Sequence, residues 1–109
     1  PILAVVGCFA EGTTHLYNAA IARKKESDRI AAMQQELTKM GARCIELPDG
    51  LTITRSRLHG AALDGHKDHR VAMSLAVAAF GASSPSQLAG SDCVQKTYKD
   101  FFLEIERVQ

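Results

Sequence analysis

Two stretches of the sequence gather charged and polar side chains of the kinds that bind anions. Residues 23–29 (RKKESDR) carry four cationic side chains, and residues 65–70 (GHKDHR) combine two histidines with acidic and basic neighbours. If each stretch opens a helix, the backbone N–H groups of its first turn attract an anion. A phosphate or carboxylate could then lie over the helix start near Arg29, with Glu26 close enough to exchange a proton with it.

Individual side chains of the two stretches suit particular roles. Glu26 and Arg29 are three positions apart, which makes them neighbours on a helix surface. Asp68 can cap the first turn of a helix that begins there. His69 can donate, accept or titrate near neutral pH. Arg70 can hold a carboxylate through two parallel hydrogen bonds, which lysine cannot do.

An interpretation without chemistry is also open for each of these features. Residues 23–29 could be a solvated helix start with surface ion pairs, each worth about 0–1 kcal/mol. Residues 65–70 could be an aspartate cap with a surface histidine and arginine beside it. Lys96 is a further lone cation, and a lone lysine is usually solvated surface.

A metal site is the less favoured interpretation of the second stretch. His66 and His69 are three positions apart, with His59 nearby and with Asp64 and Asp68 as possible oxygen ligands. No histidine pair has the four-residue helical spacing of zinc proteases, and no cysteine pair assists. We therefore predict no metal and no cofactor.

Composition and charge exclude several classes of protein. Of the 109 residues, 46% are hydrophobic and 23% are charged, the usual mixture for a globular domain. Thirteen basic residues against twelve acidic ones leave a net charge of +1, so we expect no bulk attraction to nucleic acid or to an anionic membrane. The longest apolar stretches, residues 1–10 and 71–82, are too short to span a bilayer. The widely spaced cysteines favour a reducing, cytoplasmic location.

The clearest predicted helix covers residues 26–40. Its apolar residues recur at spacings of three, four and three positions and form one stripe, made of Ile30, Met33, Leu37 and Met40. Ser27 and Asp28 suit the first turn, and Gly41 suits the C-terminal cap. The intervening polar residues fall mostly off the stripe: Gln34, Gln35, Glu36 and Lys39.

Periodicity and turn residues predict the remaining elements. The Pro-Asp-Gly turn at residues 48–50 predicts a hairpin, and the apolar helices over 2–10 and 68–80 are expected to be largely buried. The full set is helices over 2–10, 26–40, 68–80 and 99–108, and strands over 13–18, 42–47, 51–55, 61–63 and 87–89. A weak repeat places Lys25 and Lys96, 71 positions apart, each ahead of a helix.

In this order, the charged stretches resemble the C-terminal part of the 5-enolpyruvylshikimate-3-phosphate (EPSP) synthase family. The matching segments are Lys25-Glu26-Ser27-Asp28-Arg29, Asp68-His69-Arg70, and Lys96 followed by Asp100-Phe101-Phe102. Each motif alone is weak, whereas the ordered set is specific and covers essentially the whole chain.

The resemblance implies an α/β (α+β) fold made of βαβαββ units, arranged as an inside-out α/β barrel with helices inside and sheets outside. Residues 1–109 would be part of the C-terminal domain, a partial domain of roughly one and a half units. The N-terminal domain would be absent, together with a catalytic aspartate that the family carries just before the first helix. We therefore expect a piece of a longer protein that supplies half of an active site and is inactive alone.

The resemblance also implies an activity, the transfer of the enolpyruvyl group of phosphoenolpyruvate to the 5-hydroxyl of shikimate-3-phosphate. Glu26 would deliver a proton to the methylene carbon of phosphoenolpyruvate, and Lys25 would contact shikimate-3-phosphate. The expected partners are these two substrates and the N-terminal domain, with neither nucleic acid nor membrane. The residues implied for binding phosphoenolpyruvate, or glyphosate in its place, are Arg29, His69, Arg70 and Lys96.

Two other functions stay open at this point. The related UDP-N-acetylglucosamine enolpyruvyl transferases share the fold and the chemistry but lack the pairing of Lys-Glu-Ser-Asp-Arg with Asp-His-Arg. A free-standing anion-binding α/β module without catalysis would also account for the cations at the predicted helix starts.

Overall fold

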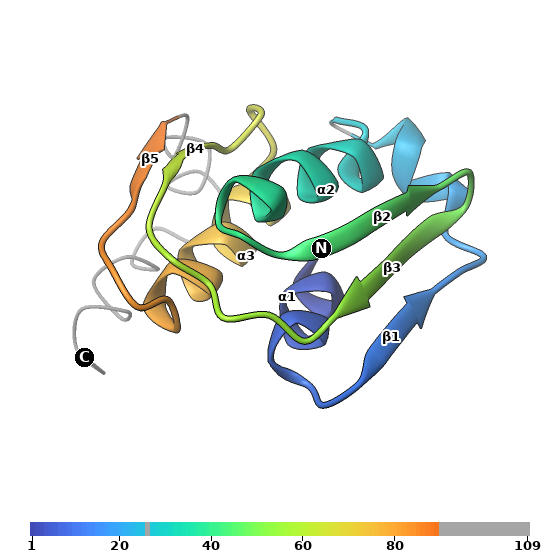
Figure 1. The fold of residues 1–109 in the computed structure, drawn as a ribbon. Helices are drawn as coiled ribbons and strands as arrows, with labels where there is room; N and C mark the ends of the chain where they lie inside the picture. The colour runs from blue at the N-terminus through green and yellow to red at the C-terminus, as the bar shows by residue number, and fades with distance from the viewer. Residues whose placement is uncertain (26, 90–109) are drawn as a thin grey trace.

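Helices and strands alternate along the chain in the computed structural model, which describes residues 1–25 and 27–89 (Figure 1). The described helices are α1 (Ile2–Phe9), the 3-10 helix η1 (Ala20–Lys24), α2 (Arg29–Lys39) and α3 (His69–Phe80). The described strands are β1 (Thr13–Leu16), β2 (Arg43–Leu47), β3 (Gly50–Thr54), β4 (Ala62–Asp64) and β5 (Gln87–Ala89). This order confirms the predicted α/β class, and the predicted helix over 99–108 lies outside the described residues.

The first sheet has the strand order β1-β3-β2, and both pairings are antiparallel. Cys44 of β2 lies opposite Ile53 of β3, and both side chains are buried, as period-two alternation requires. The turn at residues 48–49 joins β2 to β3, so the predicted hairpin is confirmed. Gly50 is needed here because a Cβ atom at this position would collide with the carbonyl of Leu16.

The second sheet pairs β4 with β5 in parallel, with Leu63 opposite Leu88. Parallel neighbours need a crossover connection, and α3 supplies it between the two strands. The predicted strands over 61–63 and 87–89 are therefore confirmed. The crossover fixes where α3 begins, immediately after the loop of residues 65–68.

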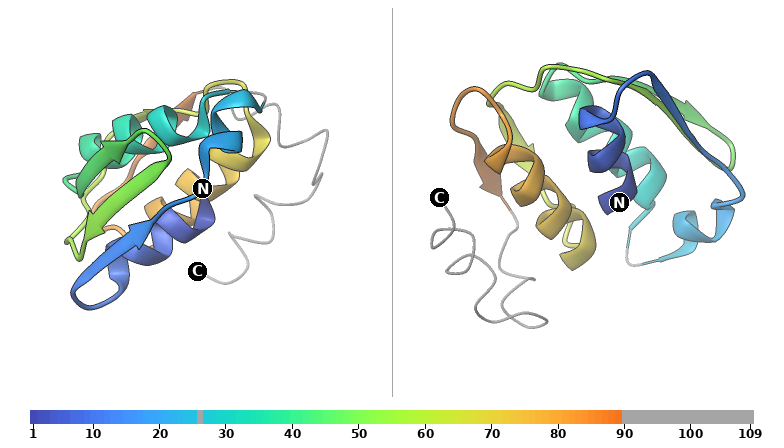
Figure 2. Two further views of the ribbon diagram at one scale, coloured as in Figure 1. Left: turned by 90° about the vertical axis from the view of Figure 1, so that its right-hand side faces the viewer. Right: turned by 90° about the horizontal axis from the view of Figure 1, so that it is seen from below.

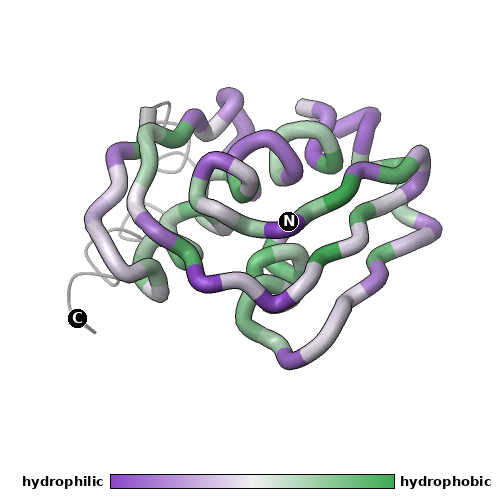
Figure 3. Tube along the Cα trace, in the orientation of Figure 1, coloured by the Kyte–Doolittle hydropathy of each residue, from purple (hydrophilic) through white to green (hydrophobic). Residues whose placement is uncertain are grey.

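The three α-helices lie side by side, with the sheets on one side of them (Figure 2). Apolar segments line this helical layer while the connecting loops are more hydrophilic (Figure 3). Side chains from α1, α2, α3 and the first sheet make the core, among them Val5, Met33, Leu37, Ile53 and Leu75. Ile30 and Met40 are also buried, so all four residues of the predicted stripe lie in the core.

Three predictions about the helices need correction. The helix expected from residue 26 begins at Arg29, because the side chain of Asp28 caps it by accepting a hydrogen bond from the amide of Ala31. The first helix is buried on only one face, since Leu3 and Val6 are 62% and 54% exposed. Glu36, expected off the apolar stripe, is 1% exposed.

Within the described part of the chain, no helix has the length and apolar character needed to cross a membrane.

Candidate anion-binding site

The segment that leads into α2 is held in place by Arg23 and Asp28. Arg23 donates to the carbonyls of Pro48 and Leu47 at 2.9 and 2.7 Å and to the Asp28 carboxylate at 2.8 Å. Burial raises the pKa of Asp28, but the Ala31 amide and Arg23 outweigh it and hold that pKa below its ordinary value. Arg23 is therefore a structural cation that anchors the start of α2 to the β2–β3 turn.

Asp68 caps the start of α3 and is completely buried. Its Oδ1 accepts from the amide of Arg70 at 3.0 Å, and its Oδ2 accepts from Ser27 Oγ and Arg29 Nε, each at 2.8 Å. Burial raises the pKa of Asp68, but the hydrogen bonds from Arg29 and Ser27 outweigh it, so the pKa lies below its ordinary value. A buried carboxylate is stable only with such partners.

These contacts bring the two charged stretches of the sequence together. Arg29 and Asp68 are 39 positions apart in the chain, yet their side chains form a buried ion pair. We call Ser27, Arg29, Asp68 and Arg70 the Asp68 cluster. Asp68 caps the helix as expected, and Arg70 joins the cluster through its backbone amide.

The start of α1 lies in the same region as the Asp68 cluster. Pro1, which precedes α1, lies close enough to Arg29 and Arg70 to feel the positive charges of both side chains. A cavity of about 230 Å³ opens between α1 and α3 beside Arg70. It is lined by Pro1, Ile2, Arg70, Met73, Ser74 and Val77. The starts of all three helices therefore meet at one end of the helical layer (Figure 2).

The other predicted site residues fall at the same end or outside the described residues. Lys25 is exposed between η1 and α2, and His69 is half-buried as the first residue of α3. Arg70 is exposed beside it. Glu26 and Lys96 lie outside the described residues, so their places in the site stay predictions.

Sequence reasoning missed the ion pair between Arg29 and Asp68. One signal in the sequence was Asp68 at the start of an apolar helix. A capping aspartate that is buried with its helix needs a cation to compensate its charge. Which of the four cations of residues 23–29 fills that place depends on tertiary packing.

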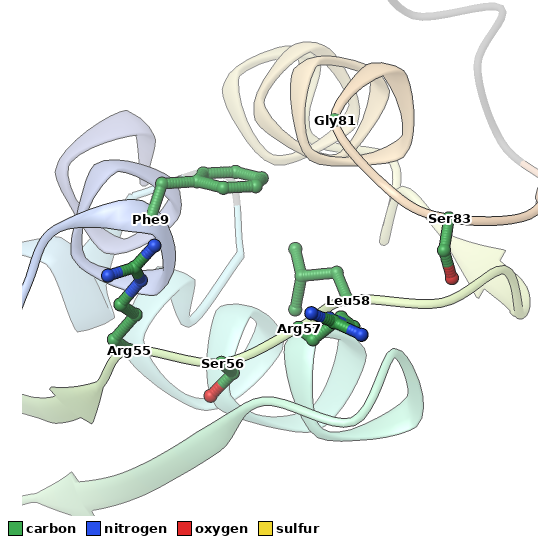
Figure 4. Close-up of a pocket in the computed structure, with 7 residues that line it drawn as sticks. All are labelled: Phe9, Arg55, Ser56, Arg57, Leu58, Gly81 and Ser83. Atoms are coloured by element: carbon green, nitrogen blue, oxygen red, sulfur yellow. The ribbon is translucent and has the colours of Figure 1, made fainter.

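A second cavity, of about 620 Å³, lies at the opposite end of the helices (Figure 4). It is lined by Phe9, Arg55, Ser56, Arg57, Leu58, Gly81 and Ser83. Phe9 ends α1 and Gly81 follows α3, so this cavity lies at the C-terminal ends of both helices, with Arg55 and Arg57 beside them. None of the residues predicted for the site lines this cavity, which leaves the Asp68 cluster as the candidate site.

Neither thiol chemistry nor a metal centre emerges from the described residues. Burial raises the pKa of Cys8 and of Cys44 to about 11, so both are inert thiols at neutral pH. Across residues 1–25 and 27–89, no three histidine, cysteine, aspartate or glutamate side chains are placed to hold a metal ion.

Comparison with known proteins gives consistent relatives. A model of the EPSP synthase (3-phosphoshikimate 1-carboxyvinyltransferase) family matches residues 1–105. The 3-phosphoshikimate 1-carboxyvinyltransferase of Synechococcus sp. (strain JA-3-3Ab) is 51% identical over 109 residues, 99% of this chain and 24% of the relative. That of Chlamydia abortus is 55% identical over 102 residues, 93% of this chain and 23% of the relative.

The fold agrees with solved structures as well. An EPSP synthase structure from Acinetobacter baumannii superposes with a TM-score of 0.92 at 35% identity, over 98% of this chain and 26% of that one. The chain thus spans about a quarter of the length of the curated relatives it matches, and the expected partial domain is confirmed. On the family match, the identities and the fold together, the chain belongs to the EPSP synthase family.

Proposed function

We propose that the protein containing this chain transfers the enolpyruvyl group of phosphoenolpyruvate to the 5-hydroxyl of shikimate-3-phosphate and releases phosphate. This is the shikimate-pathway step toward chorismate and the aromatic amino acids. The observation that carries the proposal is the Arg29–Asp68 ion pair, because it joins both charged family motifs at one helix end. The match of residues 1–105 to the family model supports it.

In this proposal Arg29 and Arg70 bind phosphoenolpyruvate, and His69 lines the same pocket. Asp68 accepts a hydrogen bond from Arg29 Nε, which fixes the plane of that guanidinium group. A guanidinium group held in one plane can meet a carboxylate or phosphate with little loss of conformational freedom. Lys25 lies exposed ahead of α2, where its flexible ammonium group can reach shikimate-3-phosphate.

The chemistry requires an acid at the methylene carbon. Protonation of that carbon makes the neighbouring carbon of phosphoenolpyruvate cationic, and the 5-hydroxyl adds to it with loss of its own proton. The new methyl group then gives up a proton as the bond to phosphate breaks, which restores the carbon–carbon double bond. We assign the proton delivered to the methylene carbon to Glu26 on the family motif, and we assign Lys96 to phosphoenolpyruvate binding on the same basis. The N-terminal domain would supply the other half of the site, across the cleft from the Asp68 cluster.

The proposal is tested by replacing the assigned acid in the full-length protein. Glu26→Gln keeps the size and polarity of the side chain but removes the proton that it donates. Turnover, followed as phosphate release that depends on shikimate-3-phosphate, should fall by about 10²–10⁴-fold. Affinity for both substrates, measured by isothermal titration calorimetry, should change little.

Glu11→Gln is the matched control, because Glu11 is an exposed glutamate whose side chain is 91% accessible. It should leave both measurements unchanged. Normal turnover by Glu26→Gln would refute the assigned acid. A wild-type protein that binds both substrates without turnover would favour an anion-binding module, and enolpyruvyl transfer to UDP-N-acetylglucosamine instead would favour the related enzyme.

A further inference from the structure

Glu36 is a second buried carboxylate that the proposed chemistry does not use. It lies in the middle of α2 and is 1% exposed. A buried charge is retained only where hydrogen bonds and opposite charge compensate its lost hydration. Its partners therefore indicate what the residue holds in place.

The partners of Glu36 come from its own helix and from the β4–α3 loop. Oε1 accepts from Lys39 Nζ and from the amide of Asp64, both at 2.8 Å. Oε2 lies 2.8 Å from His66 Nε2. Burial raises the pKa of Glu36, but the bonds from Lys39, His66 and the Asp64 amide outweigh it, so that pKa is lowered. The ionised carboxylate can only accept, so His66 Nε2 carries the proton of this bond.

The β4–α3 loop has an unusual backbone that these bonds help to hold. His66 and Lys67 both adopt left-handed conformations, with φ angles of 55° and 56°. Two consecutive non-glycine residues with positive φ are sterically unfavourable and persist where the surroundings determine them. The amide of His66 also bonds to Asp64 Oδ1 at 2.8 Å, which tightens the same turn.

This loop leads directly into the candidate site. The amide of Asp68 donates to the carbonyl of Gly65 at 3.0 Å, so the capping aspartate depends on the same turn. The Asp68 carboxylate accepts hydrogen bonds from Arg29 Nε and from the backbone amide of Arg70, two residues further on. Glu36 and Arg29 both belong to α2. The helix therefore contacts the loop twice, once at each end of residues 64–68.

We propose that Glu36 is a positioning residue, which fixes the β4–α3 loop through His66 and thereby holds Asp68 and Arg70 in place for anion binding. This inference rests on the proposed function, because it gives the loop a role in binding phosphoenolpyruvate. Glu36 and His66 act through the loop and do not touch the substrate themselves.

The test compares two substitutions of His66 in the full-length protein. His66→Asn suits a left-handed backbone but is too short to reach Glu36, whereas His66→Gln can still place an amide donor there. His66→Asn should raise the KM for phosphoenolpyruvate by about tenfold or more and change kcat far less. His66→Gln should restore the KM to within about threefold of the wild type.

Three further measurements separate positioning from general stability. Amide hydrogen exchange in residues 64–70 should accelerate about tenfold or more in His66→Asn, without a matching change in β1–β3. Adding Glu36→Gln to His66→Asn should raise the KM little further, because both substitutions disrupt the same contact, that between Glu36 and His66. His15→Asn, a control at an exposed histidine of β1, should change neither readout.

The possible outcomes each decide the matter. Unchanged loop exchange and unchanged KM in His66→Asn would overturn the positioning role. So would a loss of kcat and stability with an unaltered KM, which is the result for a purely structural contact. If the wild type shows no turnover, the proposed function fails separately. In that case loop exchange and the Kd of phosphoenolpyruvate, by calorimetry, still decide the role of Glu36.

Discussion

Replacing Asp68 by asparagine tests whether the buried ion pair holds the candidate site together. Asparagine still caps a helix well, so the bond from the Arg70 amide survives while the negative charge is lost. Arg29, 9% exposed, then loses this carboxylate as its ionic partner. Removing one member of a buried pair typically costs about 3–5 kcal/mol. We expect the free energy of unfolding of the full-length protein to fall by about that amount.

Asp28→Asn provides a matched control at the other capped helix. Asp28 also caps a helix and pairs with an arginine at 2.8 Å, but its side chain is 40% exposed. Solvent screening makes such exposed pairs weak. In urea denaturation of the two variants beside the wild type, Asp68→Asn should therefore lower the midpoint far more than Asp28→Asn. If the two substitutions lowered the urea midpoint equally, burial would not explain why the Arg29–Asp68 pair contributes more to stability than the exposed pair.

The same pair predicts a pH dependence. The pKa of Asp68 is lowered in the folded protein from its ordinary value of 3.8. A lowered folded-state pKa stabilises the protein fully above the ordinary value, and this contribution is lost as the pH falls through the folded value. The gap in stability between wild type and Asp68→Asn should be largest at neutral pH and should narrow below about pH 4. A gap that stays constant down to pH 2 would contradict the assignment.

Three further predictions concern Arg70, Gly50 and the two described cysteines. Arg70→Lys should weaken phosphoenolpyruvate binding about 10- to 100-fold in calorimetry, because lysine cannot form two parallel hydrogen bonds to a carboxylate; an unchanged Kd would count against the role of Arg70. Gly50→Ala should lower the melting temperature by several degrees, since its Cβ meets the Leu16 carbonyl, and a melting temperature equal to that of the wild type would show that β1 yields easily. Cys8 and Cys44 should resist a thiol reagent at pH 8 until the protein unfolds, because burial raises each pKa to about 11; rapid native labelling found by peptide mass spectrometry would contradict this.

Local patterns predicted most of the fold. The apolar stripe of α2 and the hairpin turn at residues 48–49 could be predicted because both depend on residues close together in the chain. The sequence pattern predicts the start of α2 three residues too early, because Asp28 suits both a first turn and a cap. Sequence alone does not decide between the first turn and the cap for Asp28, because its ion pair with Arg23 forms only in the folded chain.

Periodicity in the sequence does not predict which side chains far apart in the chain contact one another. Glu36 occupies a polar position in the helical pattern, yet Lys39 and His66 make its burial possible. The sequence does not distinguish Arg29 from the other three cations of residues 23–29, whereas in the fold only tertiary packing places it against Asp68. Hydropathy predicts a largely buried α1, but one apolar face of this helix is exposed. Hydropathy alone does not show which side of a helix is covered by a neighbouring element.

The pairing of Arg29 with a fully buried aspartate also bears on how the site could evolve. If Arg70 binds phosphoenolpyruvate as proposed, replacing this exposed residue should lower the affinity for substrate and for an anionic inhibitor without weakening the fold. Replacing Arg29 would leave the buried Asp68 carboxylate without this ionic partner and lower the free energy of unfolding as well. Resistance substitutions should therefore accumulate at the accessible cation before they reach the enclosed one.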